Sequence, residues 1–156
     1  MNSPKILAVG AALVCIAVAL LVTGLVVVPP PSSGSYSLPV TVTRSTCVTP
    51  PGFILVIADL SGFNDSIAHG APFNPWPVIR VRQGDVVRLL VCNTDSTQPH
   101  ALAIQTYFDR GIIMAPGEAF RIQFQATLAG SFVIYCNIFC TVHAFMVGRL
   151  IVQPGT

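Results

Sequence analysis

The chain has 156 residues, of which 53% are hydrophobic and only 9% are charged, with a formal net charge of +2. This length suits one domain together with a membrane segment. The small net charge and the lack of a basic run argue against nucleic acid as a partner. The five cysteines are spaced too unevenly for a disulfide framework to account for all of them.

Residues 6–28 contain no charged side chain. A membrane-spanning helix needs ~20 apolar residues, whereas the apolar part of a signal peptide has roughly 7–15. The segment 1–28 is therefore predicted to be a short tail and an uncleaved transmembrane helix, with cleavage as a signal peptide or lipoprotein as the alternative. Because Lys5 precedes the span, the N-terminus is predicted to be cytoplasmic, and the rest of the chain is predicted to lie on the outer face of the cell membrane.

Residues 29–37 are rich in Pro, Ser and Gly and predict a stiff linker. The remainder, residues 38–156, is predicted to be one domain. It contains short β-rich or alternating runs separated by turn residues, at 40–44, 53–58, 78–81, 86–92, 100–105, 120–124, 131–135 and 147–152. Seven or eight short strands of this kind predict an all-β sandwich.

Two features of the intervening loops have more than one interpretation. Asn64-Asp65-Ser66 matches the pattern for N-glycosylation, although a plain polar loop explains it equally well. Trp76 is interpreted as an edge or core aromatic, with a partner-contact surface as the alternative.

Cys47 and Cys92 are a candidate disulfide. In the run from Val87 to Asn93 the odd-numbered residues are predicted to face the core, so Cys92 points to the opposite face together with Leu90. Cys47 lies in the early strand region that would cover that face.

A cluster of soft ligand residues lies near the C-terminus, at Cys136, Cys140, His143 and Met146. Sulfur ligands together with imidazole suit copper, zinc or iron–sulfur centres, and a weak Met ligand beside Cys and His points to copper electron transfer. A Cys136–Cys140 disulfide and a zinc site are the alternatives.

A copper site of this kind usually takes a second histidine. His100 follows a polar loop and begins a predicted strand, which places it at an end of the sandwich where loops gather. His69 has no such setting and is interpreted as a surface residue. His100 is therefore the predicted additional ligand.

These residues resemble the cupredoxin family, and in particular the copper-A domain of subunit II of heme–copper oxidases. The motifs that carry the resemblance are Cys136 to Cys140, the preceding 115–118 and 130–135, and the exit strand at 147–152. The resemblance covers about residues 76–154 together with the anchor, because a single span before the domain resembles the short ba3-type subunit. It implies a cupredoxin-like Greek-key β-sandwich after one N-terminal transmembrane helix. It also implies a site for two copper ions, whose ligands would be His100, Cys136, the Ile138 carbonyl, Cys140, His143 and Met146.

The sequence departs from the copper-A pattern at one point. Two residues, Thr141 and Val142, separate Cys140 from His143, where copper-A proteins have three. The spacing from Cys140 to Met146 instead resembles the mononuclear copper protein amicyanin, which leaves Cys136 without a role. Because a free thiol beside copper is prone to oxidation, two copper ions are favoured over one.

The resemblance implies a membrane-anchored electron carrier that forms the electron-accepting subunit of an oxidase rather than a catalyst on its own. Its partners would be the heme–copper catalytic subunit and an external donor: a copper protein, a cytochrome or a membrane complex. With only six acidic residues, a carboxylate patch for a basic cytochrome c is not expected. A free-standing mononuclear carrier and a copper-delivery protein are the alternatives.

Overall fold

The computed structural model describes residues 39–155. The predicted membrane helix and linker lie outside these residues. Within them, no helix is long and apolar enough to cross a membrane. The elements are β1 (Thr41–Ser45), β2 (Ile54–Asp59), β3 (Gly62–Phe63), β4 (Val78–Arg82), β5 (Val86–Asn93), β6 (His100–Ile104), β7 (Phe108–Met114), β8 (Ala119–Gln125), β9 (Gly130–Tyr135), the 3₁₀ turn η1 (His143–Phe145) and β10 (Val147–Gln153).

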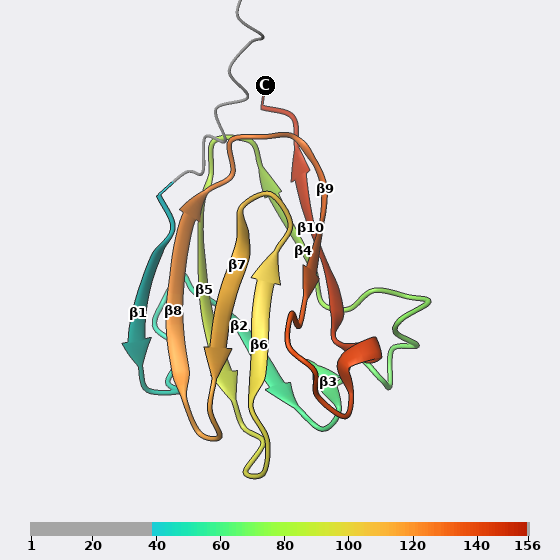
Figure 1. Ribbon diagram of the computed structural model, residues 1–156. Coiled ribbons are helices and arrows are strands. Elements are labelled where there is room, and N and C mark those ends of the chain that lie inside the picture. The colour runs from blue at the N-terminus through green and yellow to red at the C-terminus, as the bar shows by residue number, and fades with distance from the viewer. Residues whose placement is uncertain (1–38, 156) are drawn as a thin grey trace, which may run out of the picture. The chain divides into compact units, whose positions relative to one another are not determined.

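The strands form two five-stranded sheets, with the orders β1-β8-β5-β2-β3 and β4-β10-β9-β6-β7 (Figure 1). Most neighbouring pairs are antiparallel, but β5 pairs with β2 and β10 pairs with β4 in parallel. The predicted all-β sandwich is confirmed.

The core lies between the two sheets and follows the alternation expected of half-buried strands. Val87, Leu89 and Val91 of β5 face it, as do Phe120, Ile122 and Phe124 of β8. Leu90 and Cys92 point to the opposite face, where Ala119, Phe53 and Leu55 form a second small cluster. Cys92 forms a disulfide there with Cys47, which confirms that prediction.

The sequence patterns missed two strands. β3 has only two residues, too few to show any period. β7 contains the polar run Asp109-Arg110-Gly111 directly after its first residue, Phe108, and its pairing with β6 shifts register between Leu102 and Ile104. Such an irregularity disrupts the alternation by which a strand is recognised in a sequence. β7 is nevertheless an edge strand of the sheet that carries His100.

The long segment between β3 and β4 extends from the side of the sandwich (Figure 1), but several polar contacts tie its ends to the strands. Trp76 is half-buried; its indole N–H donates to the Asn64 carbonyl at 2.8 Å, and its ring stacks on exposed His69 at 3.9 Å. The Asn64 side chain bonds the main chain of β2 at Leu55 and Ile57. Because that amide is already engaged and the Ser66 side chain is buried, the geometry favours a structural role for this motif over glycosylation.

Candidate metal centre

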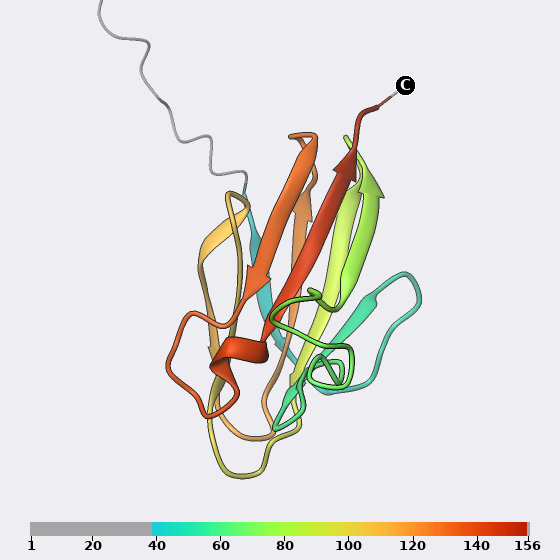
Figure 2. The same ribbon diagram turned by 90° about the vertical axis from the view of Figure 1, so that its right-hand side faces the viewer.

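The loop from Cys136 to Met146 connects two adjacent antiparallel strands, β9 and β10. The pairing of Tyr135 with Val147 brings the ends of the loop together, and the Cys136 N–H donates to the Met146 carbonyl at 3.3 Å. Figures 1 and 2 place this loop at the end of the sandwich opposite the C-terminus. The first and last sulfur residues of the sequence cluster are therefore neighbours in space.

Three sulfur atoms gather inside this loop. The Cys140 Sγ lies 3.8 Å from the Cys136 Sγ and 3.5 Å from the Met146 Sδ. Both cysteines are unbonded to each other and buried, and Met146 is fully buried. Burial, and after it the neighbouring Cys136, raises the pKa of the Cys140 thiol to about 11. The metal-free thiol therefore keeps its proton at neutral pH, and a bound metal ion would displace it.

His143 and the Ile138 carbonyl complete this group. The ligand atoms of Cys136, Cys140 and His143 all lie within 4.8 Å of one another. The Ile138 oxygen is 2.8 Å from the His143 Nδ1 and accepts a weak hydrogen bond from the Cys136 thiol at 3.3 Å. Five of the six predicted ligand groups are thus linked by short contacts.

His100 lies outside this 4.8 Å group, but its surroundings mark it as a ligand candidate. It is fully buried as the first residue of β6, and its Nε2 lies 3.1 Å from the Asp95 carboxylate. An ionised carboxylate only accepts hydrogen bonds, so in neutral His100 the proton belongs on Nε2 and Nδ1 keeps its lone pair. Among the described residues, this Nδ1 is the one buried side-chain nitrogen or oxygen without a partner.

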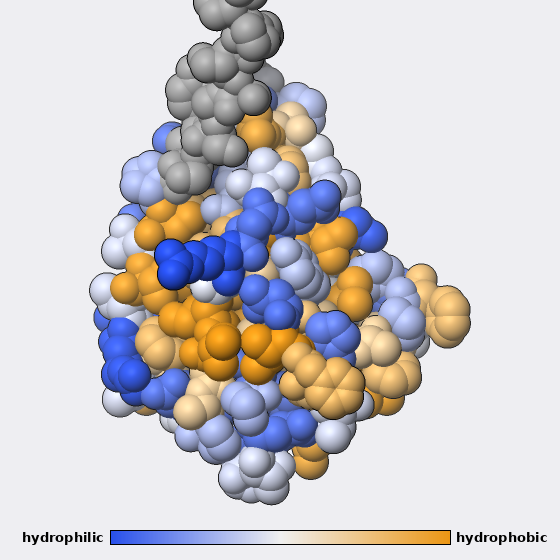
Figure 3. All heavy atoms as spheres, in the orientation of Figure 1, coloured by the Kyte–Doolittle hydropathy of each residue, from blue (hydrophilic) through white to orange (hydrophobic). Residues whose placement is uncertain are grey.

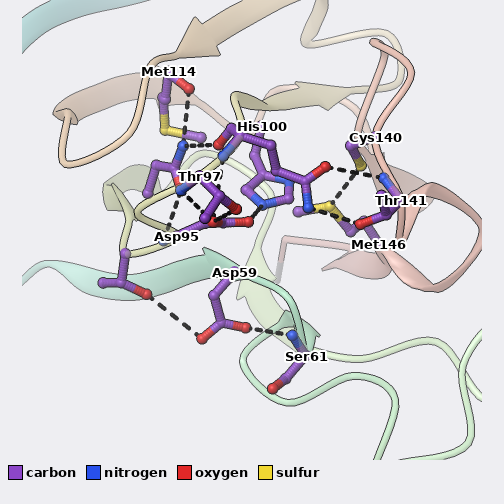
Figure 4. A network of polar contacts seen from close by, with 12 residues as sticks. Asp59, Ser61, Asp95, Thr97, His100, Met114, Cys140, Thr141 and Met146 are labelled. Carbon is purple, nitrogen blue, oxygen red and sulfur yellow. Dashed lines mark hydrogen bonds and ion pairs between the residues drawn. The ribbon is translucent and has the colours of Figure 1, made fainter.

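Residues of the loop that contains Asp95 keep its carboxylate ionised next to His100. Burial alone would raise its pKa, but hydrogen bonds from Thr97, Gln98 and His100 outweigh burial and hold the pKa well below its usual value. A carboxylate that fixes the tautomer and orientation of a metal-binding histidine is a frequent second layer of metal sites. Figure 4 shows His100 between Asp95 and the Cys140–Met146 pair.

Gln98 joins the His100 loop to the sulfur loop. The side-chain N–H of Gln98 donates to the Thr141 hydroxyl at 2.7 Å, and the side-chain Oε1 of Gln98 accepts from the Thr141 main-chain N–H at 3.2 Å. Gln98 is two residues from His100, and Thr141 follows Cys140. Two hydrogen bonds therefore connect the loop before His100 to the loop that contains Cys140, next to the predicted ligands.

The donor set fits copper better than the alternatives. Zinc would use two thiolates and two imidazoles and leave the Met146 sulfur without a role. A disulfide between Cys136 and Cys140 is not formed. Thiolate, thioether and imidazole together are the ligands that copper electron-transfer sites use. The unpartnered His100 Nδ1 is the kind of buried atom that a bound metal ion would satisfy.

The sequence patterns found the candidate ligands but missed the residues that support them. Asp95, Gln98 and Ser66 looked like ordinary loop residues, and a polar loop just before His100 was the one available hint. His69 lies on the surface, as predicted, away from the sulfur group and stacked on Trp76.

No protein-family model and no curated protein matches this chain. Among solved structures, Lac15 from a marine microbial metagenome has a TM-score of 0.52 at 24% identity, over 66% of this chain and 32% of that one. Auracyanin from Roseiflexus castenholzii has a TM-score of 0.50 at 17% identity, over 65% of this chain and 97% of that one. Amicyanin from Paracoccus versutus has 0.48 at 23% identity, over 73% and 97%. The likenesses to Lac15 and auracyanin show that the fold is a cupredoxin-like sandwich of two sheets.

Proposed function

We propose that this protein is a membrane-anchored copper electron carrier, and that it serves as subunit II of a heme–copper terminal oxidase with a binuclear copper site. One observation carries the proposal: two buried, reduced thiols lie 3.8 Å apart beside a thioether, an imidazole and a main-chain carbonyl. Copper bound there would carry one electron at a time by cycling between its two common oxidation states. The fold supports this role without specifying the number of ions.

The protein's own residues provide a rigid and mostly dry site. Cys136, Cys140, Met146 and His100 are buried, so a metal held by them would be shielded from water. His143 is exposed, which makes it the candidate ligand nearest a redox partner. Electrons would therefore pass through His143.

The surface beside the site is apolar rather than acidic. Phe139, within the ligand loop, is 93% exposed, and Ile113 of β7 is 58% exposed. Figure 3 shows apolar side chains gathered across the middle of the face formed by β6 and β7. This surface suits a partner that docks through apolar contacts, such as another copper protein or a membrane complex.

A mononuclear site is the second candidate. It is favoured by the Cys140-x2-His143-x2-Met146 spacing and by the 3.5 Å contact between the Cys140 and Met146 sulfurs. In that case Cys140, His143, Met146 and His100 form the whole site, and Cys136 has no ligand role.

The deciding experiment loads the full chain with copper in detergent and measures the copper-to-protein ratio and the electron paramagnetic resonance spectrum. A ratio near two, with hyperfine splitting shared over two ions, supports the binuclear site. A ratio near one with splitting from a single ion contradicts it. No intense thiolate-to-copper absorption would favour copper delivery over electron transfer.

Cys136→Ser sharpens this test. In a binuclear site the variant loses the shared splitting, whereas in a mononuclear site it keeps the spectrum of the wild type. Cys15→Ser, in the predicted membrane segment, is the matched control and leaves the spectrum unchanged. Co-purification with heme subunits from host membranes, lost when residues 6–28 are deleted, tests the oxidase and anchoring parts of the proposal.

A further inference from the structure

The segment that follows β3 touches the turn that carries His143. The Ser66 side chain is fully buried, and its hydroxyl donates to the Phe145 carbonyl at 2.7 Å. The same oxygen accepts the Phe63 N–H at 3.0 Å. One hydroxyl therefore joins the main chain at Phe63 to the main chain at Phe145, which is 79 residues from Ser66 in the sequence. Figure 2 shows the two segments side by side.

The local backbone is shaped so that this hydroxyl can reach its partner. Gly62 has φ +92°, and a Cβ there would lie 2.0 Å from the Ser66 Oγ. Asn64 and Asp65 both have left-handed backbone angles, which these two residue types tolerate better than most. Together they turn the chain back, so that Ser66 comes to lie under Gly62 and against Phe145.

The turn held by Ser66 has little stability of its own. η1 is a single 3₁₀ turn of three residues with no side-chain cap and no buried residue. Short 3₁₀ segments have poor hydrogen-bond geometry, and one isolated helical turn is unfavourable in water. The position of η1 therefore depends on its attachments to the rest of the protein.

Phe145 lies between two candidate ligands of opposite character. His143 is exposed two residues before it, and Met146 is fully buried immediately after it. The Met146 N–H donates to the His143 carbonyl at 3.2 Å, so the Phe145 carbonyl lies within the hydrogen-bonded turn that carries both ligands. A hydrogen bond to that carbonyl therefore restrains the turn on which His143 and Met146 lie.

We propose that Ser66 is a positioning residue for the candidate metal centre, and that its bond to the Phe145 carbonyl, for which Gly62 makes room, sets the placement of His143 and Met146. The inference rests on the proposed copper function. A residue that only stabilised the fold would leave the metal site unchanged, whereas a positioning role for Ser66 predicts a change in the metal site itself.

The experiment compares Ser66→Ala with the wild type in the full chain. In the metal-free protein, amide hydrogen exchange at residues 143–146 rises in the variant, because the turn loses its buried attachment. In the copper-loaded protein, the thiolate-to-copper absorption band and the hyperfine splitting shift. The Kd for copper rises about 10-fold, as for other residues that support metal ligands.

Gly62→Ala provides an independent route to the same state. The added Cβ displaces the Ser66 hydroxyl without removing it, so the spectrum shifts in the same direction as in Ser66→Ala. In the double variant the spectral shift is smaller than the sum of the two single shifts, because both substitutions act on the same hydroxyl, while the strain of an alanine at φ +92° is present in either background. Additive spectral shifts in the double variant would overturn the proposal.

Val152→Ala is the control for stability. Val152 is buried in β10 and pairs with Gly130, at the far end of β9 from Cys136. This variant lowers the stability of the domain without changing exchange at residues 143–146 relative to neighbouring segments, or the copper spectrum. If Ser66→Ala behaves like Val152→Ala, Ser66 is structural and the proposal is wrong.

These experiments distinguish a failure of the proposed copper function from a failure of the proposed role of Ser66. If the wild-type protein binds no copper, the proposed function is wrong, and hydrogen exchange in the metal-free protein still decides whether Ser66 holds the turn. If copper binds but Ser66→Ala leaves both exchange and spectrum unchanged, the proposed function stands and the role of Ser66 is overturned.

Discussion

The two candidate histidine ligands are held in contrasting ways. His100 is fully buried, begins a β-strand and is fixed by a buried ionised carboxylate. His143 is exposed, lies in a single 3₁₀ turn and contacts a neutral main-chain carbonyl. One histidine is therefore part of the rigid interior, whereas the other depends on neutral hydrogen bonds to a loop.

In the proposed copper site, this difference would separate two tasks that a redox site must combine. The buried half would fix the ligand geometry, because Asp95 and β6 leave His100 little freedom. The exposed half would bring a ligand to the surface where a partner protein could approach. Gln98 connects the two halves by bonding Thr141 across the loops.

The largest expected contrast is between His100→Ala and His143→Ala. His100→Ala opens a buried cavity and removes the hydrogen bond to ionised Asp95, so the free energy of unfolding of the metal-free protein falls by about 3 kcal/mol. His143→Ala alters an exposed side chain and changes it by no more than about 0.5 kcal/mol. Urea unfolding of the two variants measures the contrast.

Both substitutions weaken copper binding, which separates the ligand role from stability. His69→Ala is the matched control: it removes an exposed histidine that is not a candidate ligand, lowers the unfolding free energy by no more than about 1 kcal/mol through the lost stacking on Trp76, and leaves copper affinity unchanged. Equal unfolding free energies for His100→Ala and His143→Ala would refute the proposed division of the site.

The next effect concerns acid stability in the buried half. The pKa of Asp95 is held low in the folded protein, so between that value and its ordinary pKa near 3.9 the unfolded chain binds more protons than the folded one. The contribution of ionised Asp95 to the free energy of unfolding is present in full above its ordinary pKa, and it is lost as the pH falls below that pKa. One proton corresponds to about 1.4 kcal/mol per pH unit.

Asp95→Asn cannot ionise, so its unfolding free energy falls less steeply with decreasing pH than that of the wild type. Urea unfolding from pH 6 to pH 3, in the metal-free protein, measures both slopes. Parallel pH profiles for the two proteins would show that Asp95 is not the source of the acid sensitivity.

A smaller effect is expected from cutting the link between the halves. Gln98→Met keeps the approximate size of the side chain but removes both hydrogen bonds to Thr141. We expect a loss of about 1–2 kcal/mol in unfolding free energy and a shift in the thiolate-to-copper absorption band. Gln125→Met is the control, since Gln125 bonds the Gly84 carbonyl at a site distant from the metal loop. An unshifted band in Gln98→Met would mean that the two loops keep their geometry independently.

The smallest effect on stability is expected at Phe139. Because this side chain is 93% exposed, Phe139→Ser changes the unfolding free energy by less than about 0.5 kcal/mol and leaves the copper spectrum unchanged. It removes apolar contact area beside His143, so electron self-exchange between copies of the protein slows by about tenfold, equivalent to about 1.4 kcal/mol of contact energy. Nuclear magnetic resonance on mixtures of oxidised and reduced protein measures this rate.

Much of the site was predictable from local spacing. Cys136, Cys140, His143 and Met146 fall within eleven residues, and any hairpin connecting β9 to β10 would bring the ends of that loop together. His100 was predictable because a polar loop placed it at the start of a strand. The disulfide followed from the alternation in β5, which put Cys92 on the face away from the core.

The supporting residues were not predictable in the same way. Ser66 meets Phe145 across 79 residues, and nothing in its local sequence indicates that contact. The strand β7 was hidden because Asp109, Arg110 and Gly111 break the alternation in its first half. These features depend on partners that are distant in the sequence.

The sequence by itself determined the set of soft candidate ligands, the strand-rich character of the domain and the face on which each β5 residue lies. These follow from residue type and from periods of two residues, which are local properties. The tertiary structure alone decided that Asp95 bonds the His100 Nε2 while Nδ1 has no partner, that Gln98 links the two loops, and that the Ser66 hydroxyl bonds the Phe145 carbonyl. Those contacts arise where loops from different strands converge at one end of the sandwich, and only the packing of the two sheets fixes that convergence.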